Sequence, residues 1–208
     1  MQKVDRNWEA KFDADMFDDY KESWVEQERL RQQNSTICWI YIGIDTQRSG
    51  EIKVGKTTGE LGTRASSTQN PYYTVFHAFK IKHQSTAATI ASIEASVFDM
   101  LDKKYVRIKH WGSSKPSEWF KVKPGASEWL TPETLTDLIE IFLYELHSSH
   151  MYCYYCVTRG RGVIHGWRNP LIKGNVPSYQ ATDLSSPPVS IECLMPGGCG
   201  DENCHCFK

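Results

Sequence analysis

Two short stretches in the first third of the chain place chemically active side chains between apolar ones. The stretch "ICWIYIGI" sets Tyr41 among alternating isoleucines, and "EIKVG" sets Lys53 between an isoleucine and a valine. Successive side chains of a strand point to opposite faces of a sheet. If the isoleucines of two paired strands face the core, Tyr41 and Lys53 must share the other face. Gly43 and Gly55 stand beside them and leave room for a substrate backbone to approach.

A carboxylate completes the set of reactive groups. The run "TAATIASIEASVFDMLDK" (86–103) lacks Gly and Pro and predicts a helix, and Glu94 falls within its apolar stripe. A carboxylate in such a stripe is costly unless a metal, a cation or hydrogen bonds satisfy it. Two interpretations stay open at this point: a metal ligand, or a buried glutamate paired with an arginine.

The elements that must position these groups follow from the hydrophobic periodicity. Residues 8–33 predict one amphipathic helix, whose aromatic and methionine side chains recur every four residues and are expected to pack on the body. The other predicted elements are a hairpin of strands 36–44 and 51–55, a short helix starting near Thr57, a strand over 73–82, the helix 86–103, a strand over 117–122 and a helix over 131–148. Thr58 is expected to cap the short helix.

The composition is that of a folded protein, and its charge is uneven. The chain has 208 residues, with 40% hydrophobic and 24% charged side chains, which excludes a disordered chain. Residues 36–123 carry thirteen basic and seven acidic side chains, whereas both flanking regions are acidic. The basic block predicts either a nucleic-acid surface or an ordinary solvated surface. No apolar run is long enough to span a bilayer and no secretory signal is evident, so we expect a soluble, cytoplasmic protein without a membrane partner.

The region after residue 150 is rich in Gly, Pro, Ser and Cys and contains six of the seven cysteines. In a reducing compartment such clustering favours metal ligands over disulfides. We expect a structural Zn²⁺ held by a subset of these thiolates, the alternative being free thiols on a flexible end. The candidate ligands are Cys153, Cys156, Cys193, Cys199, Cys204 and Cys206. If zinc is bound there, the loop 158–170 could contact DNA through Arg159, Arg161 and Arg168, with Trp167 offering a stacking face.

Five ordered landmarks of the chain together resemble the GIY-YIG nucleases, in the divergent phage and bacterial branch of that superfamily. They are "WIYIG" (39–43), "KVGKT" (53–57), Arg64, Glu94 within "IEASVF", and "SEWF" (117–120). Either short motif alone would be a weak signal. The resemblance implies an α+β fold, with a three-stranded antiparallel sheet flanked by helices, and a one-metal hydrolysis of phosphodiester bonds in DNA.

The resemblance also implies roles for individual residues. Tyr41 matches the tyrosine that helps to activate or orient the attacking water, Arg64 the arginine that holds the scissile phosphate, and Glu94 the carboxylate that anchors Mg²⁺ or Mn²⁺. Lys53 stands where many members have a second tyrosine. An ammonium there can orient water or neutralise charge that develops on the phosphate. Glu118, in the last landmark, is interpreted as structural.

Three further residues near these motifs are candidates for substrate contacts. Lys56 and Thr57 follow the second motif directly and could touch the phosphate. His77, in "TVFHAF", could be a general base, although a histidine on an apolar strand face is more often a satisfied core residue.

The expected organisation is an N-terminal helix (1–35), a GIY-YIG-like nuclease domain (36–123), a helical extension (124–149) and a Cys-rich tail (150–208). The expected activity is that of a metal-dependent endonuclease. The alternative is an inactive nucleic-acid-binding or protein-interaction module on the same fold. A single active site cuts one strand, so double-strand cleavage would need a dimer or sequential turnovers.

Overall fold

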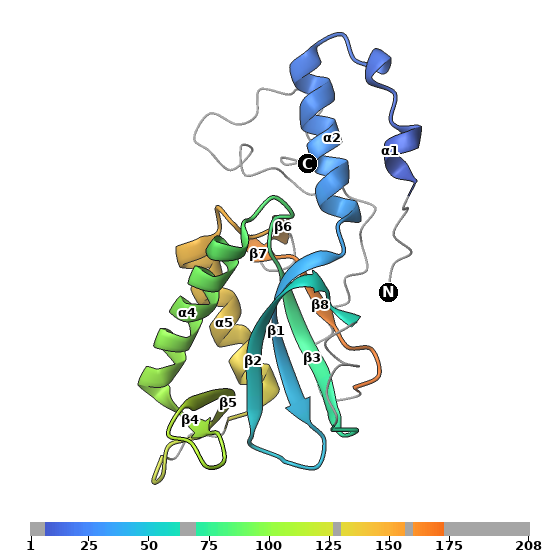
Figure 1. Ribbon diagram of the computed structural model, residues 1–208. Helices are drawn as coiled ribbons and strands as arrows, with labels where there is room; N and C mark the ends of the chain where they lie inside the picture. Colours follow the sequence, from blue (N-terminus) through green and yellow to red (C-terminus); the bar gives the residue numbers. More distant parts are fainter. Residues whose placement is uncertain (1–6, 63–69, 127–129, 157–159, 173–208) are drawn as a thin grey trace.

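The protein is a mixed α+β structure built around one antiparallel sheet (Figure 1). The computed structural model describes residues 7–62, 70–126, 130–156 and 160–172. The helices are α1 (Trp8–Lys11), the 3-10 helix η1 (Ala14–Met16), α2 (Tyr20–Asn34), α4 (Ala87–Lys104) and α5 (Pro132–His147). The strands are β1 (Ile37–Asp45), β2 (Ile52–Glu60), β3 (Tyr73–Lys80), β4 (Tyr105–Lys109), β5 (Pro116–Val122), β6 (Cys153–Cys156), β7 (Arg161–Ile164) and β8 (Gly166–Arg168).

The main sheet confirms the predicted antiparallel core and extends it at both edges. Its strand order is β4-β5-β2-β1-β3-β8, so the predicted strands β1, β2 and β3 lie at its centre. Two of its strands, β4 and β8, were not predicted. β8 pairs with β3, although it belongs to the region that was expected to be an irregular tail. A separate hairpin of β6 and β7 belongs to that region too.

The hydrophobic core lies between the sheet and two helices. In Figure 1, α4 and α5 lie side by side on one face of the sheet. Ile40, Ile42, Ile52 and Val54 from the central strands join the core with side chains from both helices. The opposite face has its own smaller cluster, formed by Trp39, Tyr41, Leu61, Val75 and Ala78. The alternation predicted from the sequence is therefore observed on both central strands.

Both helices that pack on the sheet begin at capping residues. Thr86 Oγ1 accepts a hydrogen bond from Thr89 N at 3.1 Å and starts α4. Thr131 and Thr134 form a reciprocal capping box at the start of α5, where Pro132 occupies the first turn. Because α5 buries Leu135, Ile139 and Leu143 in the common core, the predicted helical extension is part of the main body.

The N-terminal region differs most from its prediction. The expected single helix over 8–33 is divided into α1, η1 and α2. Asp13 Oδ1 accepts from Asp15 N at 3.0 Å, and Asp19 Oδ1 accepts from Lys21 N at 2.9 Å, so each aspartate starts a new helical segment. Met16 and Tyr20 are 79% and 81% exposed. The expectation that this stripe packs on the body is therefore wrong.

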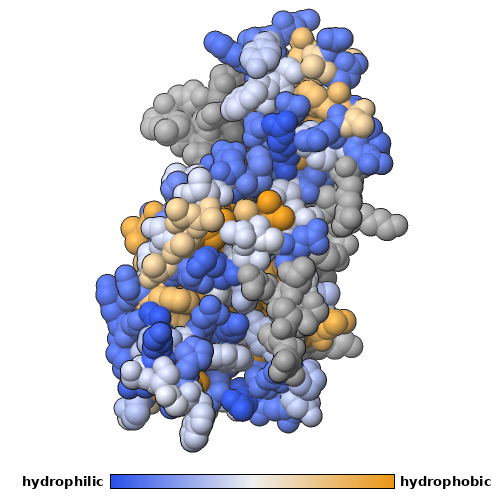
Figure 2. Space-filling view, viewed as in Figure 1, coloured by the Kyte–Doolittle hydropathy of each residue, from blue (hydrophilic) through white to orange (hydrophobic). Residues whose placement is uncertain are grey.

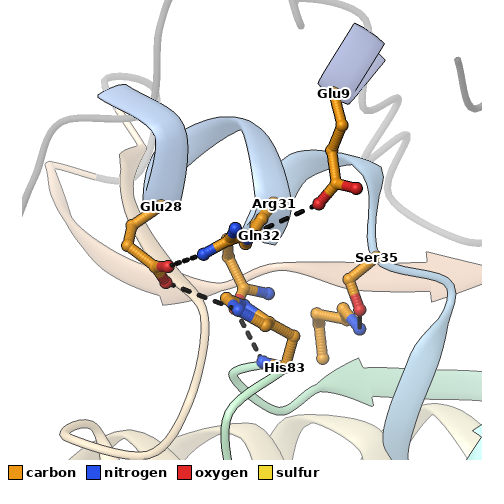
Figure 3. A network of polar contacts seen from close by, with 7 residues as sticks. Glu9, Glu28, Arg31, Gln32, Ser35 and His83 are labelled. Atoms are coloured by element: carbon orange, nitrogen blue, oxygen red, sulfur yellow. Dashed lines mark hydrogen bonds and ion pairs between the residues drawn. The ribbon is translucent and has the colours of Figure 1, made fainter. Parts of the chain in front are cut away.

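Polar contacts attach α2 to the body (Figure 3). Gln32 Oε1 accepts a hydrogen bond from the backbone N–H of His83 at 2.8 Å. Glu28 lies 3.4 Å from His83 Nε2 and 2.7 Å from Arg31. Arg31 in turn contacts Glu9 of α1 at 3.5 Å. None of the helices in the described ranges is long and apolar enough to cross a membrane.

Lys80 is a buried cation at the junction of α2 with the sheet. Its Nζ donates to Ser35 Oγ at 3.1 Å and to the carbonyl oxygen of Ile37, and it lies 4.8 Å from the centroid of the Trp39 ring. These contacts favour the ammonium form. Burial opposes them and lowers the pKa of Lys80 to about 8.

This pKa predicts a pH dependence of stability. The unfolded chain keeps the Lys80 proton up to about pH 10.5, whereas the folded chain releases it near pH 8. Because the unfolded state binds more protons in this window, the free energy of unfolding should rise with pH there, by about 2–3 kcal/mol. Urea unfolding at pH 7 and at about pH 10 should show this rise in the wild type relative to Lys80→Met. Parallel pH profiles for the two proteins would contradict it.

Candidate functional site

The face of the sheet opposite α4 and α5 brings Tyr41 and Lys53 together, as the sequence predicted. Tyr41 pairs with Gly55 across the β1–β2 ladder, and Gly43 pairs with Lys53. Lys53 Nζ lies 6.0 Å from the centroid of the Tyr41 ring and 5.5 Å from that of the Tyr73 ring. Both distances are in the range of cation–π attraction. A cation thus stands beside two phenols on this face.

The two glycines serve these phenol rings. A Cβ atom on Gly55 would lie 2.8 Å from the hydroxyl oxygen of Tyr41, and one on Gly43 would lie 2.3 Å from that of Tyr73. Real Cβ atoms do not approach other atoms so closely, so any larger residue would displace the rings. The space beside the glycines was expected to admit a substrate backbone. It is filled instead by the tyrosine side chains.

Glu118 is the carboxylate that reaches this face. Its Oε2 lies 3.1 Å from Lys53 Nζ, and 3.3 Å from the position that a Cβ of Gly55 would occupy. The hydroxyl of Tyr41 and the carboxylate of Glu118 therefore both lie over Gly55. Two observations explain how Glu118 gets there. The β2–β5 ladder pairs Ile52 with Phe120 and Lys53 with Trp119, and β5 has an irregular register with β4 in the segment that contains Glu118.

Glu94 lies on the other side of the sheet. Lys56 pairs with Ile40, a core residue, so the Lys56 side chain points toward the helices. There its Nζ forms an ion pair with Glu94 Oε2 of α4. Glu94 is 8% exposed, and the partner that satisfies it is a lysine, where an arginine had been one interpretation of the sequence. Pairing with Lys56 removes part of the cost of burying this carboxylate.

The two groups of polar side chains flank one strand edge. Gly55, beneath Tyr41 and Glu118, is followed directly in β2 by Lys56, which holds Glu94. The ladder between β2 and β5 reaches only to Lys53, so this segment of β2 lies beyond its pairs with β5. We call the set Tyr41, Lys53, Lys56, Glu94 and Glu118 the β2-edge site. It consists of two polar groups on opposite faces of β2: Tyr41, Lys53 and Glu118 on one face, and Lys56 with Glu94 on the face that meets the helices.

Other predicted residues lie away from these groups or outside the described ranges. Thr57 is buried opposite Trp39 and accepts a hydrogen bond from Gly59 N at 3.1 Å. Thr58 is part of β2, so it does not cap a helix there. The His77 ring packs 4.7 Å from that of Phe79, which places it against the core. Arg64 lies outside the described residues.

A hard cation such as Mg²⁺ typically takes one or two protein carboxylates and fills its other positions with water and phosphate. The site has two carboxylates, Glu94 and Glu118, which lie on opposite faces of the sheet, and each already neighbours a lysine. Within the described ranges no group of three or more His, Cys, Asp or Glu side chains is arranged to hold a metal.

The described part of the predicted zinc tail is a regular hairpin. Cys153 pairs with Ile164 and Cys156 with Arg161, so the two thiols, three residues apart, point to opposite faces of β6. Cys153 packs against the core, and burial raises its pKa to about 11, which disfavours the thiolate that zinc requires. Cys193, Cys199, Cys204 and Cys206 lie outside the described residues. Zinc in the tail stays a prediction, without support from this pair.

Of the residues proposed from sequence for DNA contact in this region, Trp167 and Arg168 are engaged in packing, Arg161 is exposed in β7, and Arg159 lies outside the described residues. Trp167 packs against the cluster around Tyr41. The Arg168 guanidinium lies 3.5 Å from the centroid of the Phe76 ring and 3.3 Å from Glu133. Both side chains therefore help to hold β8 and α5 on the sheet.

Sequence reasoning missed Tyr73, which lies beside Lys53 of the site, and gave Glu118 only a structural role. The signal for Glu118 was present in "SEWF", but the register irregularity between β4 and β5 around it has no signature in a single sequence. Tyr73 follows the Asn70-Pro71 turn, and its reach over Gly43 depends on the register between β1 and β3.

Comparisons of the chain with models of known protein families, with curated proteins and with solved structures found no match.

Proposed function

We propose that the protein is a metal-dependent DNA endonuclease of the GIY-YIG type that hydrolyses phosphodiester bonds at the β2-edge site. The observation that carries the proposal is the convergence of the Tyr41 hydroxyl and the Glu118 carboxylate over Gly55, with Lys53 at 3.1 Å from Glu118. The resemblance of both motifs to that superfamily supports it. So does the excess of basic side chains in residues 36–123.

The chemistry assigns each group a task. Water attacks phosphorus, the bond to the leaving oxygen breaks, and that oxygen finally takes up a proton. The Tyr41 hydroxyl orients the attacking water by hydrogen bonding. The Lys53 ammonium stabilises the additional negative charge on the phosphate oxygens, and Glu118 together with the two phenol rings fixes its position.

Glu94 is the proposed anchor of the divalent cation, with Lys56 balancing its charge before substrate binds. A bound Mg²⁺ would supply Lewis-acid stabilisation of phosphate charge. Arg64, by the resemblance, would hold phosphate oxygens through the two parallel hydrogen bonds that a guanidinium can donate. In this arrangement Lys56 is released from Glu94 and becomes available to a phosphate oxygen.

The proposal is tested by incubating supercoiled plasmid with the wild-type protein in Mg²⁺ and, in parallel, with a chelator. We expect the protein to convert the plasmid to nicked or linear DNA in the Mg²⁺ incubation and to leave it supercoiled in the chelator. DNA binding is measured on the same preparation by fluorescence anisotropy. Binding without cleavage of plasmid, duplex or single strands in Mg²⁺ or Mn²⁺ would overturn the proposal.

That outcome would favour the second candidate, a catalytically inactive nucleic-acid-binding module. One observation speaks for it: each carboxylate of the site already neighbours a lysine, as in ordinary structural ion pairs. Against it stands the placement of a phenol, an ammonium and a carboxylate together over a glycine, which folding alone does not require.

A further inference from the structure

The hairpin of β4 and β5 ends in an exposed tryptophan. Trp111 at its tip is fully exposed. The turn around it is ordered by hydrogen bonds, because His110 N donates to Lys115 O at 3.0 Å and Ser113 N donates to His110 O at 3.1 Å. Gly112, with φ of 69°, allows the sharp turn. The fold therefore holds an indole ring in solvent on a hydrogen-bonded turn.

Two exposed lysines, Lys109 and Lys115, flank this tip, and Lys103 and Lys104 lie at the base of the hairpin, at the end of α4. Residues 103–117 contain five Lys or Arg residues and no Asp or Glu. Arg107 is paired with Asp102 at 2.6 Å, whereas Lys103, Lys104, Lys109 and Lys115 are exposed. In Figure 1 the hairpin projects at the lower end of the molecule, and Figure 2 shows that end to be largely hydrophilic. The tip of the hairpin is thus basic, with two exposed ammonium groups beside the indole ring.

The combination restricts the class of partner. An exposed lysine cluster favours an anionic ligand, and an indole face offers a stacking surface for a planar group. Single-stranded nucleic acid satisfies both, because its phosphates bind ammonium groups while its unpaired bases stack on aromatic rings. A lipid surface is the less suitable partner, since the neighbours of Trp111 at the tip are His110, Gly112, Ser113 and Ser114, which add no apolar area to insert.

We propose that the β4–β5 hairpin binds an unpaired segment of nucleic acid, with Trp111 stacked on a base and the lysines of the hairpin on the backbone. This inference rests on the proposed function and gives its substrate class: DNA with a single-stranded portion, such as a flap, gap or junction. β5 continues from the tip to Glu118 at the β2-edge site. A strand held at Trp111 is thereby led toward that site.

The experiment measures binding without cleavage, in a chelator, using a fluorescein-labelled oligothymidylate and a blunt duplex of equal length. We expect the wild type to prefer the single strand. Trp111→Ala should weaken single-strand binding roughly 5- to 100-fold, and Trp111→Phe should restore much of it. Trp24→Ala, which removes an exposed tryptophan of α2, should leave it unchanged. Replacing Lys109 and Lys115 by Ala should weaken binding to both forms and flatten its salt dependence.

Three outcomes would overturn the inference. The first is that Trp111→Ala binds the single strand as tightly as the wild type, and the second is that Trp24→Ala loses as much single-strand affinity as Trp111→Ala. The third is that the protein binds vesicles rich in phosphatidylserine through Trp111 and does not bind DNA. Because no cleavage is needed, failure here is distinguishable from failure of the proposed function. Cleavage that is independent of Trp111 would leave the endonuclease proposal standing. Trp111-dependent binding by a protein that never cleaves would support the hairpin and refute the nuclease.

Discussion

Glu94→Gln is expected to lower the rate of DNA cleavage at least about 100-fold, because a catalytic cation contributes several kcal/mol and 1.36 kcal/mol is tenfold in rate. The amide nearly preserves the shape of the side chain and can still accept a hydrogen bond from Lys56, so the fold should persist. Far-ultraviolet circular dichroism and thermal unfolding verify this. The measurement is the single-turnover cleavage rate in saturating Mg²⁺.

Lys56→Met is the matched variant, since it removes the other half of the ion pair. If Glu94 anchors a divalent cation, removing the competing ammonium should tighten Mn²⁺ binding in the absence of DNA, whereas Glu94→Gln should abolish it. Electron paramagnetic resonance of free Mn²⁺ reports both. A purely structural ion pair predicts a different pattern: similar losses of stability in the two variants, and no change in Mn²⁺ binding in either.

Leu143→Ala should destabilise the whole protein by about 2–5 kcal/mol, the usual cost of emptying a buried leucine site. Leu143 of α5 is 0% exposed and belongs to the same core cluster as the central strands. Although α5 follows the segment predicted as the nuclease domain, its loss of packing should therefore lower the stability of β1 to β3. Urea unfolding, followed by the fluorescence of the tryptophans, measures the effect.

Leu146 on the same helix supplies the control, because its side chain is 65% exposed. Leu146→Ala should change the free energy of unfolding by no more than about 0.5 kcal/mol. Two separate unfolding transitions, with only the later one affected by Leu143→Ala, would show that α5 forms a unit apart from the sheet. That result would contradict the single core described above.

The elements predicted correctly are those in which the hydrophobic pattern of the sequence matches the face that the fold buries. β1 and β2 alternate apolar and polar residues, and α4 begins at Thr86 with an apolar stripe that the sheet buries. The same alternation placed Tyr41 beside Lys53. Local periodicity was sufficient there because one face of each element is buried.

The parts that failed depend on contacts between distant segments. β8 is three residues long, too short for a period, and the pairing of Gly166 to Arg168 with β3 makes it a strand. The helix expected over 8–33 had the right spacing, but Asp13 and Asp19 bind backbone N–H groups and divide it. Periodicity also could not show that Lys56, and not an arginine, would meet Glu94.

For the two glycines, the sequence predicted the open space correctly but not what fills it. Gly43 and Gly55 were expected to leave space on the face of Tyr41 and Lys53, and they do. That space holds the rings of Tyr73 and Tyr41. The identity of the occupant depends on which side chains reach across the sheet, and the reach of Tyr73 from β3 is a matter of register.

The most direct test of the β2-edge site compares Tyr41→Phe with Tyr72→Phe. Each variant removes one hydroxyl, from a buried tyrosine over Gly55 and from an exposed tyrosine next to Tyr73, respectively. Single-turnover hydrolysis of an end-labelled DNA in Mg²⁺ should fall about 10²- to 10⁴-fold in Tyr41→Phe and stay at the wild-type rate in Tyr72→Phe. Equal cleavage rates in the wild type and both variants would contradict the assignment of phosphodiester hydrolysis to this site.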